Sequence, residues 1–389
     1  MTGVPGQLSE EHEELVGTVR RFARDEVAPV IAGYYEKETF PYPLVRKMAA
    51  MGLFGLPFPA EYGGMGGDYL ALCLVLEELA RVDSSVAITL EAAVGLGAMP
   101  IYRFGSEAQR ERWLPDLCAG SALGAFGLTE PSGGSDAFAT RTTAVRDGET
   151  WVVNGSKAFI TNSGTDITAF VTVTAVTARG EDGRPSISTI VIPSGTPGFT
   201  VAPGYSKVGW NASDTHELAF SDCRVPLDHL LGEEGRGYAQ FLSILDEGRI
   251  AIAALSVGLA QGCVDECTRY LAEREAFGRK LGESQVLQFK VADMDARTHV
   301  ARLAYYDAAR RLVAGEPFKR EAAIAKLFAS DAAMVNAREA TQIFGGYGFM
   351  NETPVGRFYR DAKILEIGEG TSEVQRMVIA RHLGLGRAR

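Results

Sequence analysis

Apolar side chains recur at helical spacing in the two outer thirds of this chain but not in its middle third. Leu15, Val19 and Phe22 fall on one helix face, and residues 70–80 and 106–117 repeat the pattern. After about residue 238 the spacing returns. Long helices are predicted there over 285–311 and 318–343, with a break at Pro317. Two helix-rich regions therefore flank a region of a different kind.

That middle region has the pattern of short strands. Trp151–Val153 and Ser156–Ile160 flank Asn154-Gly155, a pair that suits the tight turn of a β-hairpin because both central residues need positive φ. Further strands are predicted over 170–177 and 187–192. We therefore predict an α+β protein with an N-terminal all-α domain at 1–120, a middle antiparallel β domain at 121–237 and a C-terminal helical domain of the four-helix-bundle type at 238–389.

The composition argues against several classes of protein. A net charge of −10 over 389 residues disfavours nucleic acid as a partner, because an acidic surface repels phosphate backbones. The first residues lack the pattern of a signal peptide, and the longest apolar run, Ile250–Ala260, is too short to span a bilayer. We expect a cytoplasmic protein without a membrane span, or a mitochondrial-matrix protein if the source is eukaryotic. The five cysteines have neither disulfide nor zinc spacing, so we expect packed thiols and no metal site.

Five segments combine glycine, hydroxyl, aromatic or charged side chains in patterns that suit a cofactor or a catalytic group. Glycine and serine let a ligand approach the backbone closely, and paired arginines suit a diphosphate. Taken singly, each also fits a plainer structure: a turn, a buried strand, a solvated helix end, a helix cap or a surface acid. The segments are Phe126–Asp136, Phe159–Asn162, Arg274–Arg279 with Gln285, Gln342–Gly348, and Leu365–Gln375.

The last segment carries the strongest candidate for acid–base chemistry. Glu369 lies between Gly368 and Gly370, and Ser372 with Gln375 three residues later forms a capping-box pattern that predicts a helix start. The helix dipole stabilises a carboxylate there, whereas an apolar pocket would raise its pKa. The balance of the two effects gives a carboxylate that is ionised yet basic enough to accept a proton.

In order and spacing, the five segments resemble the acyl-CoA dehydrogenase family, and residues 57–64 extend the resemblance over nearly the whole chain. The resemblance implies that family's fold, with FAD bound between the β domain and the C-terminal helices. It also implies a flavoprotein oxidoreductase of fatty acid metabolism and β-oxidation, a homotetramer built as a dimer of dimers, and electron-transfer flavoprotein as the electron acceptor.

The resemblance assigns roles residue by residue. Glu369 stands where most of the family places its catalytic base. The flavin would be contacted by Phe126, Leu128, Thr129, Gly134, Ser135, Phe159, Ile160, Thr161, Thr371, Ser372 and Glu373, and from a neighbouring subunit by Arg274, Phe277, Gln285, Gln342, Gly345 and Gly346. The acyl-CoA would be contacted by Ser135, Asp246, Gly248, Arg249 and Gly370.

The implied reaction pairs two transfers. Glu369 removes the proton next to the thioester carbonyl, and a hydride leaves the neighbouring carbon for the flavin, which gives a trans-2-enoyl-CoA. A minority of the family places the base just before Arg249, but that position is Gly248 here and cannot act as one. Many relatives carry Trp at the position of Phe159, a ring linked to electron transfer, so the acceptor is less closely defined than the substrate reaction.

Three alternatives share the fold. An acyl-CoA oxidase would pass its electrons to dioxygen, but the usual oxidases are longer than this chain. A decarboxylating enzyme of the glutaryl-CoA type needs a cation for the distal carboxylate, and the sequence does not place one. A non-catalytic, DNA-associated relative would carry a basic region, which the net charge of −10 disfavours. The stretch from Leu245 to Arg249 looks most like short- or branched-chain members.

Overall fold

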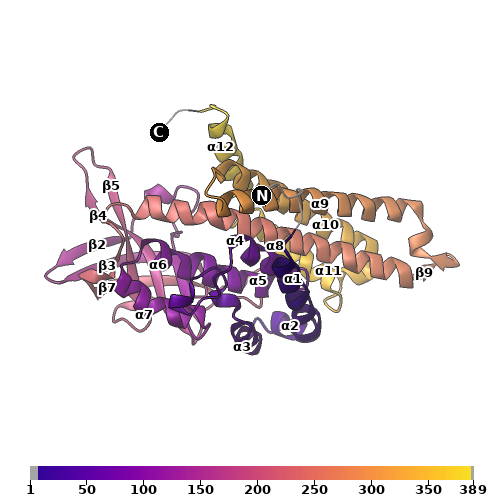
Figure 1. The fold of residues 1–389 in the computed structure, drawn as a ribbon, viewed down its shortest axis with the longest axis horizontal. Helices are drawn as coiled ribbons and strands as arrows, with labels where there is room; N and C mark the ends of the chain where they lie inside the picture. The colour runs from indigo at the N-terminus through magenta and orange to yellow at the C-terminus, as the bar shows by residue number, and fades with distance from the viewer. Residues whose placement is uncertain (1–7, 387–389) are drawn as a thin grey trace.

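One long helix, α8 (Gly237–Glu273), runs from a β-sheet at one end of the molecule to a small ribbon at the other (Figure 1). The computed structural model describes residues 8–386. The N-terminal helices pack beside α8, and the C-terminal helices extend along it towards the ribbon. The predicted α+β fold class, with a β domain between two helical regions, is confirmed.

The N-terminal region is helical up to Cys118. A π-helical turn, Ala92–Ala98, separates α5 from α6. Gly97 in that turn packs on the first strand so closely that an added Cβ would lie 2.5 Å from Gly124 O. The helices are α1 (Glu10–Phe22), α2 (Ala28–Glu36), α3 (Tyr42–Ala50), α4 (Tyr69–Ala80), α5 (Ser84–Glu91), α6 (Met99–Phe104) and α7 (Glu107–Cys118).

The middle region forms a sheet of eight strands within the described chain, in the order β6-β7-β3-β2-β4-β5-β8 with β1 beside β4. Most neighbours are antiparallel, but β1 and β2 run parallel to β4, so the sheet is mixed. The strands are β1 (Leu123–Gly127), β2 (Thr143–Asp147), β3 (Thr150–Thr161), β4 (Thr168–Arg179), β5 (Pro185–Pro193), β6 (Phe199–Val201), β7 (Thr215–Pro226) and β8 (Leu230–Leu231).

The hairpin predicted around Asn154-Gly155 is wrong. Strand β3 runs unbroken through both residues, and its ladder with β7 shifts register between Val153 and Gly155. Gly155 has φ 147°, and an added Cβ would lie 2.5 Å from Thr142 Oγ1. The glycine therefore marks a bulge with a close neighbour rather than a turn. The actual turn lies between Asp147 and Thr150.

The C-terminal region is a bundle around α8. Helix α10 places buried alanines along α8, including Ala322, Ala325, Ala329 and Ala333, and these small side chains let the two backbones approach closely. The other helices are α9 (Gln285–Val313), α10 (Lys319–Phe344), α11 (Pro354–Leu365) and α12 (Ser372–His382), and β9 (Glu275–Ala276) with β10 (Arg279–Lys280) forms the ribbon at the far end.

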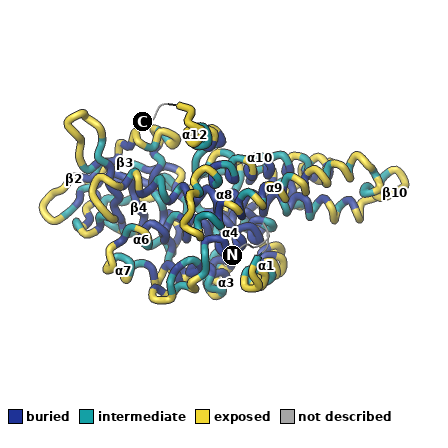
Figure 2. Tube along the Cα trace, turned by 45° about the horizontal axis from the view of Figure 1, so that its top comes forward, coloured by how far each residue is buried: buried dark blue, intermediate teal, exposed yellow. Residues whose placement is uncertain are grey.

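The apolar helices are interior helices. Residues 84–104 and α8 are long and apolar enough to cross a membrane, but 94% and 83% of their most apolar windows are buried in the protein. Figure 2 shows this burial along α4 and α8, with exposure at the β9–β10 tip and the outer loops of the sheet. The five cysteines are free and buried, as predicted.

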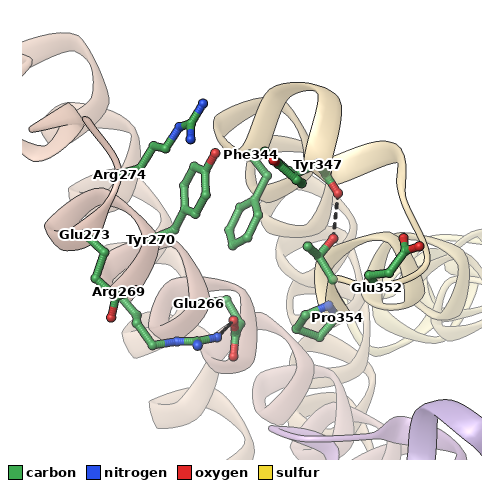
Figure 3. A pocket seen from close by; sticks show the side chains of 10 residues that line it. Glu266, Arg269, Tyr270, Glu273, Arg274, Phe344, Tyr347, Glu352 and Pro354 are labelled. Carbon is green, nitrogen blue, oxygen red and sulfur yellow. Dashed lines mark hydrogen bonds and ion pairs between the residues drawn. The ribbon is translucent and has the colours of Figure 1, made fainter. Parts of the chain in front are cut away.

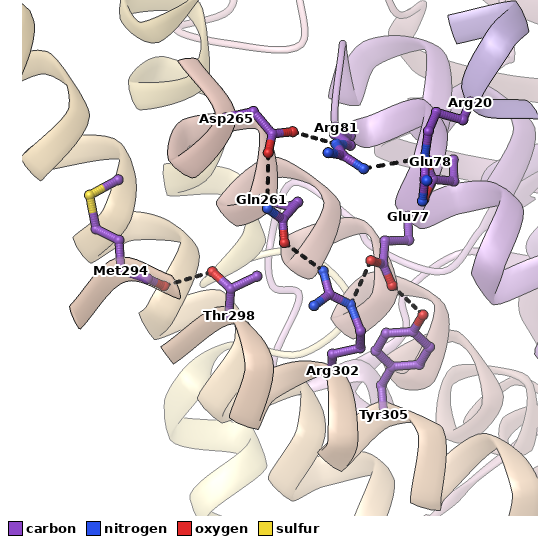
Figure 4. Close-up of polar contacts among 10 residues, drawn as sticks. All are labelled: Arg20, Glu77, Glu78, Arg81, Gln261, Asp265, Met294, Thr298, Arg302 and Tyr305. Carbon is purple, nitrogen blue, oxygen red and sulfur yellow. Dashed lines mark hydrogen bonds and ion pairs between the residues drawn. The ribbon is translucent and has the colours of Figure 1, made fainter. Parts of the chain in front are cut away.

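Buried ion pairs fix α4 against the bundle (Figure 4). Glu77 accepts from Arg302 Nε at 2.8 Å and from the Tyr305 hydroxyl. On the other side of α4, Glu78 accepts from Arg20 Nη2 at 2.7 Å. Pairing of this kind offsets the cost of burying a carboxylate, so the network helps to set where α4 lies relative to α8 and α9.

Candidate active site

Glu369 lies in the tight turn between α11 and α12. Gly368 N donates to Ile364 O at 2.7 Å, and Ser372 N donates to Glu366 O at 2.9 Å, which closes the turn. Glu369 has φ 51° and Gly370 has φ 92°. Positive φ is uncommon for a residue with a Cβ, and such strain is concentrated at functional sites. The turn directs the carboxylate towards α8.

The helix start lies one residue from the predicted position. Thr371, not Ser372, is the N-cap of α12, and its hydroxyl accepts from Val374 N at 3.3 Å. Gln375 reaches back as predicted for a capping residue, but it bonds carbonyls: Gly370 O at 2.8 Å and Glu369 O at 3.4 Å. The predicted cofactor contacts Ser372 and Glu373 therefore occupy the first turn of α12, Ser372 buried and Glu373 exposed.

Gly248 makes room for the Glu369 carboxylate. A Cβ added at Gly248 would lie 2.1 Å from Glu369 Oε2, so the absence of a side chain in α8 creates the space that the base fills. Both carboxylate oxygens are shielded from solvent and neither has a hydrogen-bond partner among the described residues. A buried acceptor without a donor costs stability, which is typical of a group held ready for a ligand.

A second buried carboxylate, Glu91, was missed by the sequence interpretation. It is the last residue of α5, its side chain is fully buried, and its oxygens lack partners among residues 8–386. Gly95, one turn later, leaves space for it: an added Cβ would lie 2.7 Å from Glu91 Oε1. The usable signal was an acid inside an apolar stretch that runs from residue 84 to 104.

The two carboxyls affect each other's protonation. Burial raises the pKa of Glu369 to about 7, against the lowering effects of the neighbouring Glu91 carboxyl and of the charges on Lys326 and Arg249. Burial, and then the negative charge of Glu369, raise the pKa of Glu91 well above its ordinary value. Two adjacent carboxylates cannot both ionise cheaply. Near neutral pH, Glu91 therefore keeps its proton and Glu369 is the member that ionises.

The predicted flavin segments of the β domain lie side by side. Phe126 of β1 stacks on Phe241 of α8, with ring centroids 3.8 Å apart. Ala158 N donates to Thr129 O at 2.9 Å, which joins the loop after β1 to β3. Along that loop Leu128 is buried, whereas Gly134 and Ser135 are exposed. The two segments therefore lie side by side, joined by the hydrogen bond from Ala158 N to Thr129 O.

The Phe159 side chain of β3 is exposed beside this contact. The residue has φ 62°, its side chain is 64% exposed, and it lies beside Tyr205 at 5.2 Å between centroids. Ile160 points inward and Thr161 is half-buried. Asn162 Nδ2 donates to Thr89 O at 3.0 Å, which docks the end of β3 on α5, two residues from Glu91. Helix α5 therefore links the strand that carries Phe159 to Glu91, the carboxyl that neighbours Glu369.

Lys157 organises the same loop from inside the sheet and was also missed. Its side chain is fully buried, and Nζ lies 2.8 Å from Glu130 Oε1 and 3.3 Å from Leu128 O. Glu130 in turn accepts from Arg141 N and Thr142 N. Burial raises the pKa of Glu130, but Lys157 and these hydrogen bonds outweigh it and lower the pKa overall. The ion pair fixes both ends of the loop from Leu128 to Thr142.

The predicted acyl-CoA residues Asp246, Gly248 and Arg249 lie within one turn in the first half of α8, and all of them are buried. Arg249 pairs with Asp246, which also binds Lys319 Nζ at 2.8 Å. Gly370 follows the base in the turn, so Gly248, Arg249 and Gly370 lie around Glu369, and Asp246 adjoins them through Arg249.

The remaining predicted cofactor residues lie elsewhere. Arg274 and Phe277 follow the end of α8, and Phe277 is fully exposed. They share the far end of the bundle with Gln285, Gln342, Gly345 and Gly346. Residues 246 and 274 are separated by about 42 Å of helix at 1.5 Å per residue. One chain therefore does not bring the two groups of residues to the same cofactor.

A hollow of about 360 Å³ lies at this far end (Figure 3). In its lining, the rings of Tyr270 and Phe344 stack with their centroids 4.1 Å apart. The guanidinium carbon of Arg274 lies 5.8 Å from the centroid of the Tyr347 ring. Its distance from Glu369 along the bundle excludes it as the pocket in which the base acts.

Comparison with known proteins places the whole chain. Three family models match in order: the acyl-CoA dehydrogenase N-terminal domain over 9–121, the middle domain over 125–223 and the C-terminal domain over 235–384. A probable acyl-CoA dehydrogenase of Bacillus subtilis is 46% identical over 97% of this chain and 99% of its own length. A short-chain-specific acyl-CoA dehydrogenase of Clostridium acetobutylicum is 44% identical over 96% and 98%.

Solved structures agree. The butyryl-CoA dehydrogenase of Megasphaera elsdenii superposes with a TM-score of 0.94 at 41% identity, covering 98% of this chain and all of that one. A glutaryl-CoA dehydrogenase of Mycobacterium smegmatis in complex with FADH2 superposes with a TM-score of 0.92 at 32% identity, covering 98% and 97%.

Proposed function

Because this chain belongs to the acyl-CoA dehydrogenase family, we propose that it oxidises a short-chain acyl-CoA thioester to the trans-2-enoyl-CoA, with Glu369 as base and FAD as the hydride acceptor. The observation that carries the proposal is the buried Glu369 carboxylate, which has no partner among the described residues and a pKa raised to about 7. A base with a pKa near the working pH is the most effective for abstracting a proton.

The chain's own groups can perform the proton half of the reaction. Glu369 accepts the proton from the carbon next to the thioester carbonyl, and Gly248 leaves the space in which the carboxylate moves. The backbone N–H of Glu369 forms no hydrogen bond within residues 8–386, so it is available to the thioester oxygen, where negative charge develops. Burial of the site excludes water and strengthens both interactions.

The described residues also fit the proposed FAD. The exposed Phe159 ring offers a flat surface, and a Cβ added at Gly345 or Gly346 would meet no other part of the described chain within 4 Å. When bound, FAD supplies the acceptor for the hydride that leaves the β-carbon. Since Arg274 and Phe159 lie at opposite ends of α8, we propose that each flavin is shared between two copies of the chain, within a homotetramer.

The proposal also names an electron acceptor, a pathway and a location. Electron-transfer flavoprotein is the proposed electron acceptor, β-oxidation the proposed pathway, and the cytoplasm the proposed location.

The test of the reaction is an anaerobic absorbance scan of the purified protein before and after addition of butyryl-CoA. Bleaching of a flavin band supports the proposal, and an unchanged band counts against a short-chain thioester. Absence of flavin even after FAD is added contradicts the dehydrogenase function. Rapid reoxidation by air would favour the oxidase instead.

A further inference from the structure

Helix α10 contains one lysine whose side chain is wholly inside the protein. Lys326 is 0% exposed and lies on the same helix as the buried alanines Ala322, Ala325 and Ala329. Its ammonium donates to a carbonyl, Gly370 O, at 2.8 Å, rather than to a carboxylate. An ammonium buried in this way carries a large desolvation cost. A methionine of similar length would fill the same volume without that cost, so packing does not explain the charge.

The hydrogen bond from Lys326 acts on the carbonyl of Gly370, the residue that follows the base. Gly370 O receives a second donor, Gln375 Nε2, also at 2.8 Å, so both of its lone pairs are used. This carbonyl follows two consecutive residues with positive φ, Glu369 at 51° and Gly370 at 92°. A turn of this kind is strained, and the two donors from α10 and α12 hold it in place.

The charge of Lys326 acts on the base itself. Among the charges around Lys326, Glu369 raises its pKa most; Asp331 and Glu366 add to this, and Arg249 opposes it. Burial nevertheless lowers the pKa of Lys326 to about 8, which is still above the value for Glu369. Near neutral pH the ammonium is therefore present while the carboxylate is forming. The other groups that face Glu369 are Glu91, Arg249 and the buried Tyr69 hydroxyl.

We propose that Lys326 is a positioning residue for the base: it holds the carbonyl of Gly370, the residue after Glu369, and supplies the buried positive charge that keeps the Glu369 carboxylate ionised. The expected effect of Lys326 on flavin reduction rests on the proposed function. Its expected effect on the ionisation of Glu369 does not. Lys326 does not touch the reacting carbon. It acts through Glu369, so its removal changes the pH at which the base works rather than abolishing the reaction.

Three substitutions separate the charge from the hydrogen bond. Lys326→Gln keeps a donor but removes the charge, Lys326→Met removes both, and Gln375→Leu removes the other donor while leaving the charge. The protonated Glu369 carboxyl is followed by infrared titration of the FAD-bound protein, with its band assigned by its absence in Glu369→Gln. This readout does not depend on turnover, so it remains informative if butyryl-CoA fails to bleach the parent and the proposed function fails.

Both Lys326 variants are expected to raise the midpoint of that titration by about 1–3 pH units, the usual effect of losing a nearby opposite charge. In Gln375→Leu the midpoint stays unchanged. Flavin reduction at pH 7 then slows about fivefold or more in Lys326→Gln and recovers as the pH rises, since one unit changes the ionised fraction about tenfold once the base is mostly protonated. Lys326→Met is expected to melt no lower than the parent, because an apolar replacement removes a buried charge.

An unmoved midpoint in Lys326→Gln overturns the proposal, and so does an equal shift in Gln375→Leu. A lower melting temperature in Lys326→Met together with an unmoved midpoint in Lys326→Gln would make Lys326 a structural residue. If Lys326→Met does not fold, the titration of Lys326→Gln alone decides.

Discussion

The α-carbon of Gly248 faces the carboxylate of Glu369 so closely that a Cβ on the glycine would lie 2.1 Å from Oε2. Helix α8 thus determines where the base lies, although the two residues are 121 positions apart in the sequence. The atom in the way is the far end of a side chain, so the substitution Gly248→Ala can be accommodated by displacing the carboxylate.

We therefore expect Gly248→Ala to fold and bind FAD but to reduce flavin about 100-fold more slowly, since a displacement of about 1 Å at a reacting group has effects of this size. Gly258→Ala on the same helix provides the contrast. Its Cβ would lie 2.2 Å from the backbone carbonyl of Glu77, which cannot move aside, so this variant should lose thermal stability instead. Equal loss of stability in both variants would contradict the distinction.

Removing the base tests the central assignment. Glu369→Gln keeps the volume and the turn but cannot accept the proton, so stopped-flow flavin reduction by butyryl-CoA should slow by about 10²–10⁴-fold. FAD content and binding of the thioester should remain near those of the parent. A variant that reduces flavin at the parental rate would place the base elsewhere.

The sequence pointed to Glu369 because its signals are local: two flanking glycines, a helix start and a family motif that lie within a dozen residues. Glu91 and Lys157 were missed because an isolated acid or lysine is usually at the surface, and only the packing of distant elements buries these two. The prediction of a turn at Asn154-Gly155 was wrong because contacts between distant segments decided the structure there too. The pairing of β3 with β7 outweighed the local preference for a turn, and the glycine instead accommodates Thr142.

Glu91 should control the pH dependence of the reaction. Glu91→Gln keeps a polar group beside Glu369 but cannot ionise, so the rise in flavin-reduction rate should stay near pH 7, and any second ionisation at higher pH should vanish. Glu91→Leu loses the polar neighbour that lowers the pKa of Glu369, so its rate should rise at a higher pH. Measuring the reduction rate from pH 5 to 10 separates the two, and identical profiles would contradict the pairing.

Stability offers a second measurement on the same variant. The pKa of Glu91 in the folded chain lies above its ordinary value of 4.5, so the folded state holds a proton that the unfolded state has released. The free energy of unfolding contributed by Glu91 is therefore present below about pH 4.5 and is lost as the pH rises towards the folded value. Glu91→Gln should melt at a higher temperature than the parent at pH 8, and at a similar one at pH 4.

The ion pair between Lys157 and Glu130 should govern retention of FAD. Lys157→Met leaves Glu130 buried without its cation, which costs about 3–5 kcal/mol in comparable pairs. The loop from Leu128 to Thr142 then loses its anchor, and the FAD dissociation constant should rise at least tenfold. Lys290→Met removes a partly exposed partner of Glu339 and should leave both stability and FAD binding nearly unchanged. Equal FAD affinity in Lys157→Met would show that the loop does not need the pair.

Sharing of the flavin between subunits can be tested by combining two defective chains. In a mixed pair of Glu369→Gln and Arg274→Gln, the site that uses the intact Glu369 of one copy also receives the intact Arg274 of the other, so one of the two sites is complete. Random mixing makes half of the pairs mixed, and activity should return to about a quarter of the parental value. Glu369→Gln mixed with Lys157→Met is the control, because Lys157 and Glu369 serve the same end of one chain and no complete site forms. Recovery in the first mixture alone supports a shared flavin, whereas no recovery in either would mean that Arg274 acts within its own chain.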